Sequence, residues 1–244
     1  MADLDSLIED LVAANRILAS EGIVDAFGHV SARHPDYPGR FLLSRARSPE
    51  LVEPGDIMEF TLDGVATASI PAKPYLERFI HGGIYELRPD VQSVVHSHSH
   101  GPIPFGLTGE KLRPVVHSSA TLGAEVPVWD AQTSFGDTDL LVSNVAMGID
   151  LAGAVGSGNC VLMRGHGSTV VGKSIREAVY TAVYLEVNAE LQWKASFLGK
   201  AKFLTPGEIE KANLRLGQAR PGEGFNRSWD YWCRRAGIPS KPSA

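Results

Sequence analysis

The sequence predicts one mixed α/β domain. Its 244 residues are 43% hydrophobic, and no low-complexity tract or linker rich in Pro, Gly or Ser divides them, so the chain can bury one large core. Apolar residues recur at helical spacing in three segments, and short β-branched or apolar runs typical of strands lie between them. We therefore expect a single domain over residues 1–244, with its core at about 5–200 and a more polar tail at about 207–244.

The first half of the chain alternates helices with strands. Apolar spacing predicts a helix over 4–18 that ends at Gly22. Three short strands bounded by turn residues follow, within 25–33 and at 41–44 and 57–60. A second helix is expected over 74–87, with Glu77 and His81 off its apolar stripe, and a short turn joins it to a β-branched strand.

The second half is less regular. Residues 115–117 are a predicted strand, whereas 124–147 show no clear period. A buried strand is expected at 160–163, and a capping box formed by Ser174 and Glu177 predicts the start of a long helix. The tail carries three aromatic residues that either attach it to the body or cover a functional site: Trp229, Tyr231 and Trp232.

Charge and cysteine content narrow the class of protein. A formal net charge of −5 and a pI near 5.9 argue against a nucleic-acid or anionic-membrane surface and favour a small-molecule partner. No apolar run approaches the length of a membrane span. Cys160 and Cys233 are too few for a disulfide framework, and the first ten residues carry acids where a secretory signal carries bases. We therefore expect a cytoplasmic protein.

Three of the eight histidines lie at alternate positions behind the β-branched run: His96, His98 and His100. Alternate side chains of a strand share a face, so His96 and His98 are expected to project together, with Cα atoms roughly 6.5–7 Å apart. Ordinary surface histidines are the alternative, but three within five residues favour a metal site. Two nitrogens do not complete such a site. His166, between two glycines at a strand end, is the expected third ligand.

Four arginines lie within fifteen residues of this acidic protein: Arg33, Arg40, Arg45 and Arg47. One interpretation is a solvated basic face. The other is a clamp for carboxylate or phosphate, because the planar guanidinium can bind either group with two parallel hydrogen bonds.

The motifs Glu77-x3-His81, His96-x-His98 and Gly-His-Gly around His166 occur in that order, before Val171-Gly172 and a helix. From about residue 5 to residue 200, the chain in this respect resembles the class II aldolase/adducin N-terminal family, which includes fuculose-phosphate and rhamnulose-phosphate aldolases and ribulose-phosphate epimerases. The resemblance implies a three-layer α/β/α fold with a central, largely antiparallel sheet. It also implies a homo-oligomer, commonly a C4 tetramer with sites at subunit interfaces.

Carried over residue by residue, the resemblance makes His96, His98 and His166 the ligands of one divalent ion. It makes Glu77 the acid/base group and a fourth ligand of the site before substrate binds. Three nitrogens with one carboxylate suit Zn, Mn, Fe or Co, and the sequence does not choose among them.

The surroundings of this motif depart from the sugar-phosphate aldolases. Those enzymes have Gly-Asn-Val/Ile-Ser, then Thr-Gly or Ser-Gly, then Ser-Ser before the glutamate, and these groups hold phosphate. Here the same places contain GHVS at 28–31, SRAR at 44–47 and Tyr75-Leu76. Ser118 also stands after His117, where the bacterial fuculose-phosphate aldolases have a proton-donating tyrosine. Cationic and aromatic groups thus occupy the places where the aldolases have neutral groups that bind phosphate.

The whole pattern resembles the family branch that decarboxylates hydroxylated aromatic acids such as 3-hydroxy-2-methylpyridine-4,5-dicarboxylate and 3,4-dihydroxyphthalate. It implies a metal-dependent decarboxylase of a small aromatic or heteroaromatic carboxylate, with Glu77 as proton donor and His29 as the competing donor. The carboxylates are expected to meet four residues: Ser44, Arg45, Arg47 and Lys73. The alternatives are a sugar-phosphate aldolase or epimerase, and a non-catalytic interaction module as in adducin.

Overall fold

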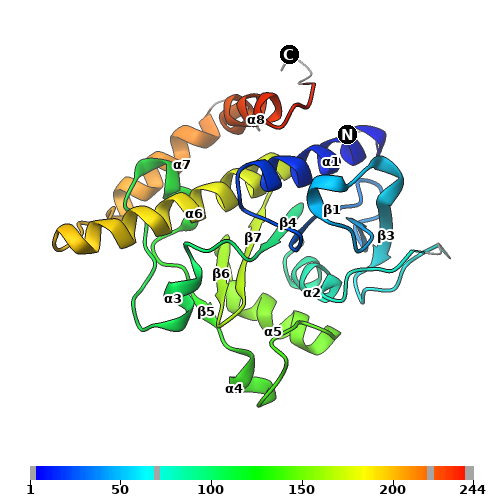
Figure 1. The fold of residues 1–244 in the computed structure, drawn as a ribbon, viewed down its shortest axis with the longest axis horizontal. Helices are drawn as coiled ribbons and strands as arrows, with labels where there is room; N and C mark the ends of the chain where they lie inside the picture. The colour runs from blue at the N-terminus through cyan, green and yellow to red at the C-terminus, as the bar shows by residue number, and fades with distance from the viewer. Residues whose placement is uncertain (1–3, 69–71, 219–222, 240–244) are drawn as a thin grey trace.

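A seven-stranded sheet forms the centre of the fold (Figure 1). The computed structural model describes residues 4–68, 72–218 and 223–239. The strand order is β3-β2-β1-β4-β7-β6-β5, and every neighbouring pair is antiparallel except β5 with β6. The strands are β1 His29–Arg33, β2 Arg40–Ser44, β3 Ile57–Thr61, β4 Ser93–Ser97, β5 Val128–Trp129, β6 Cys160–Met163 and β7 Gly167–Gly172. The expected, largely antiparallel sheet is confirmed.

Helices cover both faces of this sheet, so the arrangement has three layers (Figure 1). The α-helices are α1 Leu4–Ser20, α2 Arg78–Leu87, α3 Ile103–Leu107, α4 Ala131–Phe135, α5 Val145–Val155, α6 Ile175–Leu198, α7 Pro206–Gln218 and α8 Glu223–Arg235. Three short 3-10 helices are η1 Pro49–Leu51, η2 Pro54–Asp56 and η3 His117–Leu122.

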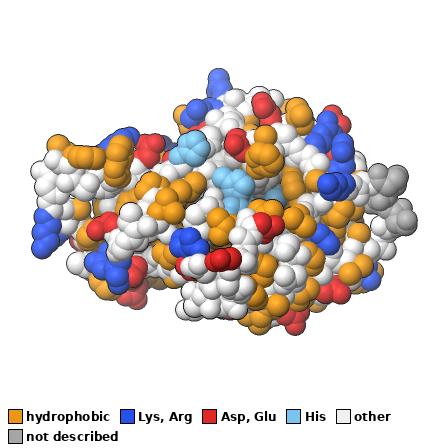
Figure 2. Space-filling view, turned by 60° about the horizontal axis from the view of Figure 1, so that its bottom comes forward, with side chains coloured by type: hydrophobic (Ala, Val, Ile, Leu, Met, Phe, Trp, Pro, Cys, Tyr) orange, Lys and Arg blue, Asp and Glu red, His pale blue; other side chains and the backbone are white. Residues whose placement is uncertain are grey.

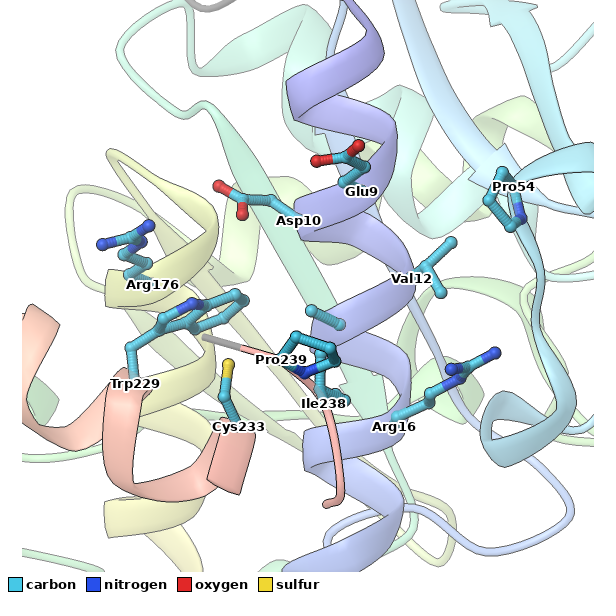
Figure 3. A pocket seen from close by; sticks show the side chains of 11 residues that line it. Glu9, Asp10, Val12, Arg16, Pro54, Arg176, Trp229, Cys233, Ile238 and Pro239 are labelled. Atoms are coloured by element: carbon cyan, nitrogen blue, oxygen red, sulfur yellow. The ribbon is translucent and has the colours of Figure 1, made fainter. Parts of the chain in front are cut away.

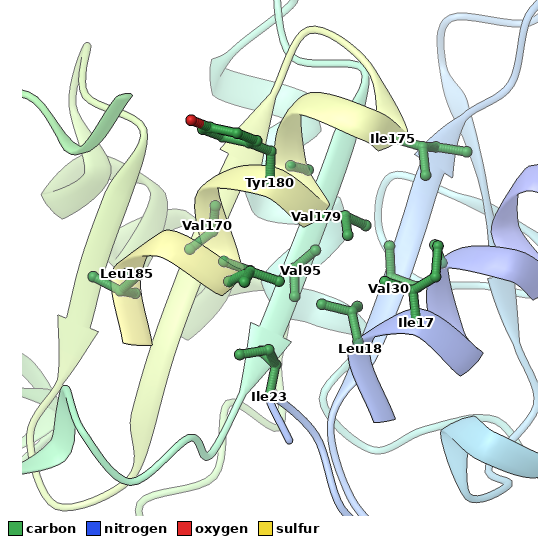
Figure 4. Packing of buried hydrophobic residues seen from close by; sticks show 14 of the residues in the cluster. Ile17, Leu18, Ile23, Val30, Val95, Val170, Ile175, Val179, Tyr180 and Leu185 are labelled. Atoms are coloured by element: carbon green, nitrogen blue, oxygen red, sulfur yellow. The ribbon is translucent and has the colours of Figure 1, made fainter. Parts of the chain in front are cut away.

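Alternate residues of the central strands face different helix layers. Val95 of β4 and Val170 of β7 belong to the apolar cluster under α1, α6 and α8 (Figure 4). Val94 and Val171 belong to a second cluster under α2 and α5. Because strand side chains alternate between the two faces of a sheet, this division follows from the period of the strand. It also explains why these strands read as continuous apolar runs rather than as an alternating pattern.

The structure corrects three details of the sequence-based assignment. The second helix begins at Arg78 rather than at residue 74, and Glu77 is its N-cap. The predicted strand at 115–117 is absent, because the Val115 amide donates to the Asn188 side chain (2.8 Å) instead of to a neighbouring strand. The strand β7 was not predicted, since its glycines at both ends and its short apolar centre resemble a loop.

The C-terminal tail packs on the body. Trp229 and Trp232 of α8 are buried in the cluster under α1 and α6, whereas Tyr231 is 58% exposed. The first of the two interpretations of these aromatics, attachment of the tail, is therefore confirmed for the two tryptophans. Within the described ranges we find no helix with the length and apolar character that a bilayer span requires.

Two glycines allow α2 and α5 to pack closely. A Cβ atom placed on Gly83 of α2 would lie 2.3 Å from the backbone carbon of Gly148 in α5. A Cβ on Gly148 would lie 2.1 Å from the carbonyl oxygen of Phe79. Both distances are far below van der Waals contact with rigid backbone, so only glycine fits. This contact fixes α2, and with it the position of Glu77, against the sheet.

We predict that Gly148→Ala lowers the free energy of unfolding by about 1–3 kcal/mol, because the added methyl group must push two backbones apart. Equilibrium urea unfolding measures this change. The matched control is Gly153→Ala in the same helix, where the glycine is exposed and a Cβ meets nothing within 4 Å. There, the higher helix propensity of alanine should raise the stability by about 0.5–1 kcal/mol. Equal effects of the two substitutions would contradict close packing at Gly148.

Candidate metal centre

Four expected metal ligands meet at one end of the central strands. His96 lies on β4, His98 directly follows β4, and His166 lies in the turn between β6 and β7. Because β4 pairs with β7, with Ser97 opposite Ser168, this turn is beside the histidine strand. Glu77, at the N-terminus of α2, approaches from the adjoining layer.

The ligand atoms of these four residues all lie within 4.8 Å of one another. The Nε2 atom of His98 is 3.0 Å from that of His96 and 2.9 Å from that of His166. Glu77 Oε2 is 3.5 Å from the Nε2 atoms of both His96 and His166. Figure 2 shows histidine side chains gathered near the middle of one face, among hydrophobic side chains.

Backbone groups fix the orientation of three of these ligands. His96 Nδ1 donates to the carbonyl of Ser168 (3.1 Å), and His166 Nδ1 donates to that of Leu140 (2.9 Å). Carbonyl oxygens only accept, so each of these rings carries a proton on Nδ1, and in the neutral form that binds a metal the lone pair of its Nε2 faces the centre. Glu77 Oε1 accepts from the Val142 amide (3.0 Å), which leaves Oε2 facing the histidines.

This donor set fits a divalent transition metal. Three imidazole nitrogens that converge to about 3 Å, together with one carboxylate, match the usual ligands of such ions. The described cluster therefore has the residue types, the spacing and the fixed tautomers that a metal requires.

The glycines around His166 have a geometric reason. Gly165 has a φ of +67°, which a residue with a side chain rarely adopts. A Cβ on Gly167 would lie 2.2 Å from the carbonyl oxygen of Ser97 and 3.1 Å from the His98 ring. The Gly-His-Gly sequence thus allows the turn to press His166 against the end of β4.

Burial and mutual proximity shape the charges of the site. Burial opposes ionisation of Glu77, but the adjacent His96 and His166 rings outweigh it and hold the pKa of that carboxyl well below its usual value. Burial and the neighbouring His96 and His166 rings lower the pKa of His98 to about 4. At neutral pH the site thus offers a carboxylate and a neutral His98 ring, the forms that bind a cation.

His29 lies beside the metal cluster, opposite His96 in the sheet, with ring centroids 5.1 Å apart. Its Nδ1 is 2.6 Å from His81 Nε2, and His81 Nδ1 is 2.6 Å from Ser31 Oγ. Ser31 Oγ is in turn 2.8 Å from the Tyr85 hydroxyl. Burial lowers the pKa of His29, and it lowers that of His81 to about 3. A buried series of hydrogen-bonded side chains therefore runs from His29, beside the metal centre, to Tyr85.

The sequence pattern alone does not link Ser31 and Tyr85 to the site. A signal for them was present, because His29 and Ser31 are alternate residues of one strand and His81 and Tyr85 are four apart on one helix. Each pair therefore projects from one face of its element. What the sequence could not show is that these two faces meet.

The residues expected to bind the substrate's carboxylates lie farther along β2 and its loop. Arg45 Nε and Arg47 Nη1 both contact the carboxylate of Asp56, at 2.5 and 2.6 Å. Ser44 is fully buried, and Lys73 is exposed. The loop is tied toward the site by Tyr75, whose hydroxyl donates to the Arg47 carbonyl and whose ring packs 4.5 Å from that of His29. The substrate role of these residues stays a prediction.

Two cavities lie in different places relative to the cluster. One of about 190 Å³ is lined by His98 together with Asp25, His100 and Glu186. A larger one of about 420 Å³ lies between α1 and α8, with Trp229 among its lining residues (Figure 3). The larger cavity contains none of the four ligands, so only the smaller one adjoins the candidate metal centre.

We predict that purified protein contains one divalent metal ion per chain, and that His96→Ala and His166→Ala lose it, because each removes one of three converging nitrogens. Elemental analysis after gel filtration measures the occupancy. His100→Ala is the matched control, since this neighbouring histidine is exposed and outside the cluster. Full occupancy in both ligand variants would exclude this site.

Comparison with known proteins identifies the family of this chain. The protein-family model for the Class II Aldolase and Adducin N-terminal domain matches residues 9–193 of this chain. The decarboxylase tropJ of Talaromyces stipitatus is 35% identical over 93% of this chain and 92% of its own length. A 3,4-dihydroxyphthalate decarboxylase of a Terrabacter species is 30% identical over 92% of this chain and 94% of its own. These relatives confirm the resemblance to the decarboxylase branch.

A solved structure agrees on the fold. The L-fuculose 1-phosphate aldolase of Glaciozyma antarctica superposes with a TM-score of 0.76 and 24% identity, over 96% of this chain and 90% of that one. At this level of identity the likeness concerns the fold alone. The family match over most of the chain and two relatives at 30% identity or more along nearly its whole length show that the chain belongs to the class II aldolase and adducin N-terminal domain family.

Proposed function

We propose that this protein is a divalent-metal-dependent decarboxylase of a hydroxylated aromatic or heteroaromatic carboxylic acid. The observation that carries the proposal is the convergence of Glu77, His96, His98 and His166 on one point. Two decarboxylases match this chain along nearly their whole length, at 35% and 30% identity. The 3,4-dihydroxyphthalate decarboxylase among them supports an aromatic substrate with adjacent hydroxyl and carboxylate groups.

The reaction breaks the bond between a ring carbon and its carboxylate. CO2 leaves, the electron pair stays on the ring carbon, and that carbon then takes a proton. Glu77 and the three histidines would hold a divalent ion, which when bound would supply a Lewis acid to stabilise negative charge as CO2 departs. Backbone contacts to His96, His166 and Glu77 hold these groups in place beforehand, so little reorganisation is needed.

For the proton, we propose Glu77 as the donor. Its carboxylate is ionised in the described arrangement because His96 and His166 hold its pKa low. A bound substrate that separates this carboxylate from the cationic centre, in a site closed to water, would raise its pKa and allow it to carry the proton. His29, at the edge of the same cluster, is the competing donor.

We propose that Arg45 and Arg47, with Ser44 and Lys73, recognise the substrate's carboxylates. Asp56 holds both guanidinium groups, and Arg45 uses only its Nε–H in that contact. The other N–H groups of each arginine can bind a substrate carboxylate without loss of the ion pair. Asp56 is then the residue that orients the two arginines.

We also propose a homo-oligomer, and a tetramer in particular. The far half of α6 extends beyond the body of the chain (Figure 1), and its apolar side chains are exposed: Trp193 by 54%, Phe197 by 73% and Leu198 by 92%. Large apolar side chains gathered on one projecting element are typical of a surface that another subunit covers.

We predict that the metal-loaded protein releases CO2 from 3,4-dihydroxyphthalate or a related ortho-hydroxy aromatic acid and forms no dihydroxyacetone phosphate from fuculose 1-phosphate. Coupled assays for both products measure this. His96→Ala should abolish CO2 release. Aldol cleavage without CO2 release would establish the rival sugar-phosphate function, and a protein that binds no metal and converts neither substrate would favour an interaction module.

We predict that Glu77→Gln keeps three nitrogen ligands but lowers kcat by about 10²–10⁴, because glutamine cannot deliver a proton. Steady-state kinetics at equal metal occupancy measure this loss, and product deuteration in D2O identifies the carbon that is protonated. Turnover close to that of the unaltered enzyme in Glu77→Gln, with a collapse in His29→Ala, would assign the proton to His29.

A further inference from the structure

The hydrogen bonds from Tyr85 through Ser31 and His81 to His29 can run in two directions, and only one satisfies every hydrogen. The four side chains are at most 3% exposed. The Tyr85 hydroxyl contacts two groups, the Val94 backbone and Ser31 Oγ. The Val94 contact lowers the pKa of Tyr85, as a donating N–H does, so Ser31 Oγ is the acceptor that the described residues offer to the Tyr85 hydrogen. Its hydrogen must therefore point to Ser31, because an unsatisfied buried donor costs more than a hydrogen bond contributes.

The remaining hydrogens follow from this first one. Ser31 accepts from Tyr85, so its own hydrogen goes to its other partner, His81 Nδ1. A neutral imidazole that accepts at Nδ1 carries its proton on Nε2, and His81 Nε2 contacts His29 Nδ1. His29 then accepts at Nδ1 and carries its proton on Nε2. The opposite direction would leave the Tyr85 hydrogen without an acceptor.

We infer that Tyr85, Ser31 and His81 fix His29 as the Nε2–H tautomer, so that His29 presents a neutral hydrogen-bond donor to an anionic oxygen of the substrate. This role rests on the proposed function. His81 is a positioning residue, since it acts through His29 and does not reach the metal ligands itself. His29 Nε2 makes no hydrogen bond within the described residues, and its ring lies against His96 and Tyr75.

The assigned tautomer leaves the Nε2–H of His29 free to donate, because Nδ1 accepts from His81. His29 therefore binds and orients a substrate oxygen through Nε2.

The tautomer can be measured without any activity. In zinc-loaded protein with ¹⁵N-labelled histidine at pH 7.5, solid-state NMR distinguishes protonated from unprotonated ring nitrogens, and His29→Gln and His81→Gln identify the signals of the two residues. We expect both rings to be protonated at Nε2 and unprotonated at Nδ1. A proton on His29 Nδ1 would overturn the inference whether or not the protein is a decarboxylase.

A pair of serine variants tests whether the hydrogen bonds from Tyr85 set the tautomer of His29. Ser31→Ala removes the link between Tyr85 and His81, so we expect His29 to become a mixture of tautomers. Ser93→Ala is the matched control, because Ser93 is equally buried but its hydroxyl takes no part in the hydrogen bonds from Tyr85 to His29. It donates instead to the Ser31 carbonyl (2.8 Å). This variant should keep the Nε2–H form. An unchanged His29 tautomer in Ser31→Ala would refute the inference.

Kinetics of two His29 variants test the donor role on the decarboxylation substrate. Glutamine keeps an N–H donor but cannot act as an acid, whereas leucine keeps neither. If His29 only donates a hydrogen bond, His29→Gln should retain at least 10 times the kcat/KM of His29→Leu, with equal metal content. Equal loss in both variants would contradict the donor role. If the enzyme releases no CO2 at all while the tautomers are as expected, the proposed function fails and the hydrogen-bond assignment stands.

Discussion

Three imidazole nitrogens and one carboxylate oxygen are held within 4.8 Å of one another where the central strands end. This convergence depends on the surrounding structure, which holds each side chain in place. The pairing of β4 with β7 supplies two of the three histidine positions, and the carbonyls of Ser168 and Leu140 select the tautomer of His96 and His166. The rest of the fold keeps these elements in register.

Glycine residues allow the close approaches on which this geometry depends. Gly167 lets the His166 turn meet β4, and Gly148 lets α5 meet α2 close to Glu77. In both places a methyl group would strike backbone atoms that cannot move without shifting a ligand. The position of the ligands is therefore set by backbone packing more than by the histidine side chains themselves.

The groups proposed to bind the substrate are cations and hydrogen-bond donors, in keeping with the proposed aromatic carboxylate. Arg45 and Arg47 share Asp56, Tyr75 links their loop to His29, and the chain from Tyr85 gives His29 a single donor. Decarboxylation and aldol cleavage both leave charge on carbon when a C–C bond breaks. One metal centre can therefore serve both, and the groups around it decide which bond is placed for cleavage.

The sequence by itself predicted the four residues that meet at the candidate metal centre, through short-range patterns, and the family, through the resemblance of its ordered motifs. Alternation on a strand aligns His96 with His98, and glycines on both sides of His166 mark a tight approach. It also anticipated the layered fold, through the resemblance. Only the tertiary structure decided that Glu77 is an N-cap, that Asp56 holds the arginines, and that Ser31 meets His81. The contacts of Asp56 and of Ser31 join residues from 9 to 50 positions apart. No local pattern predicts which faces of two elements will meet when the chain folds.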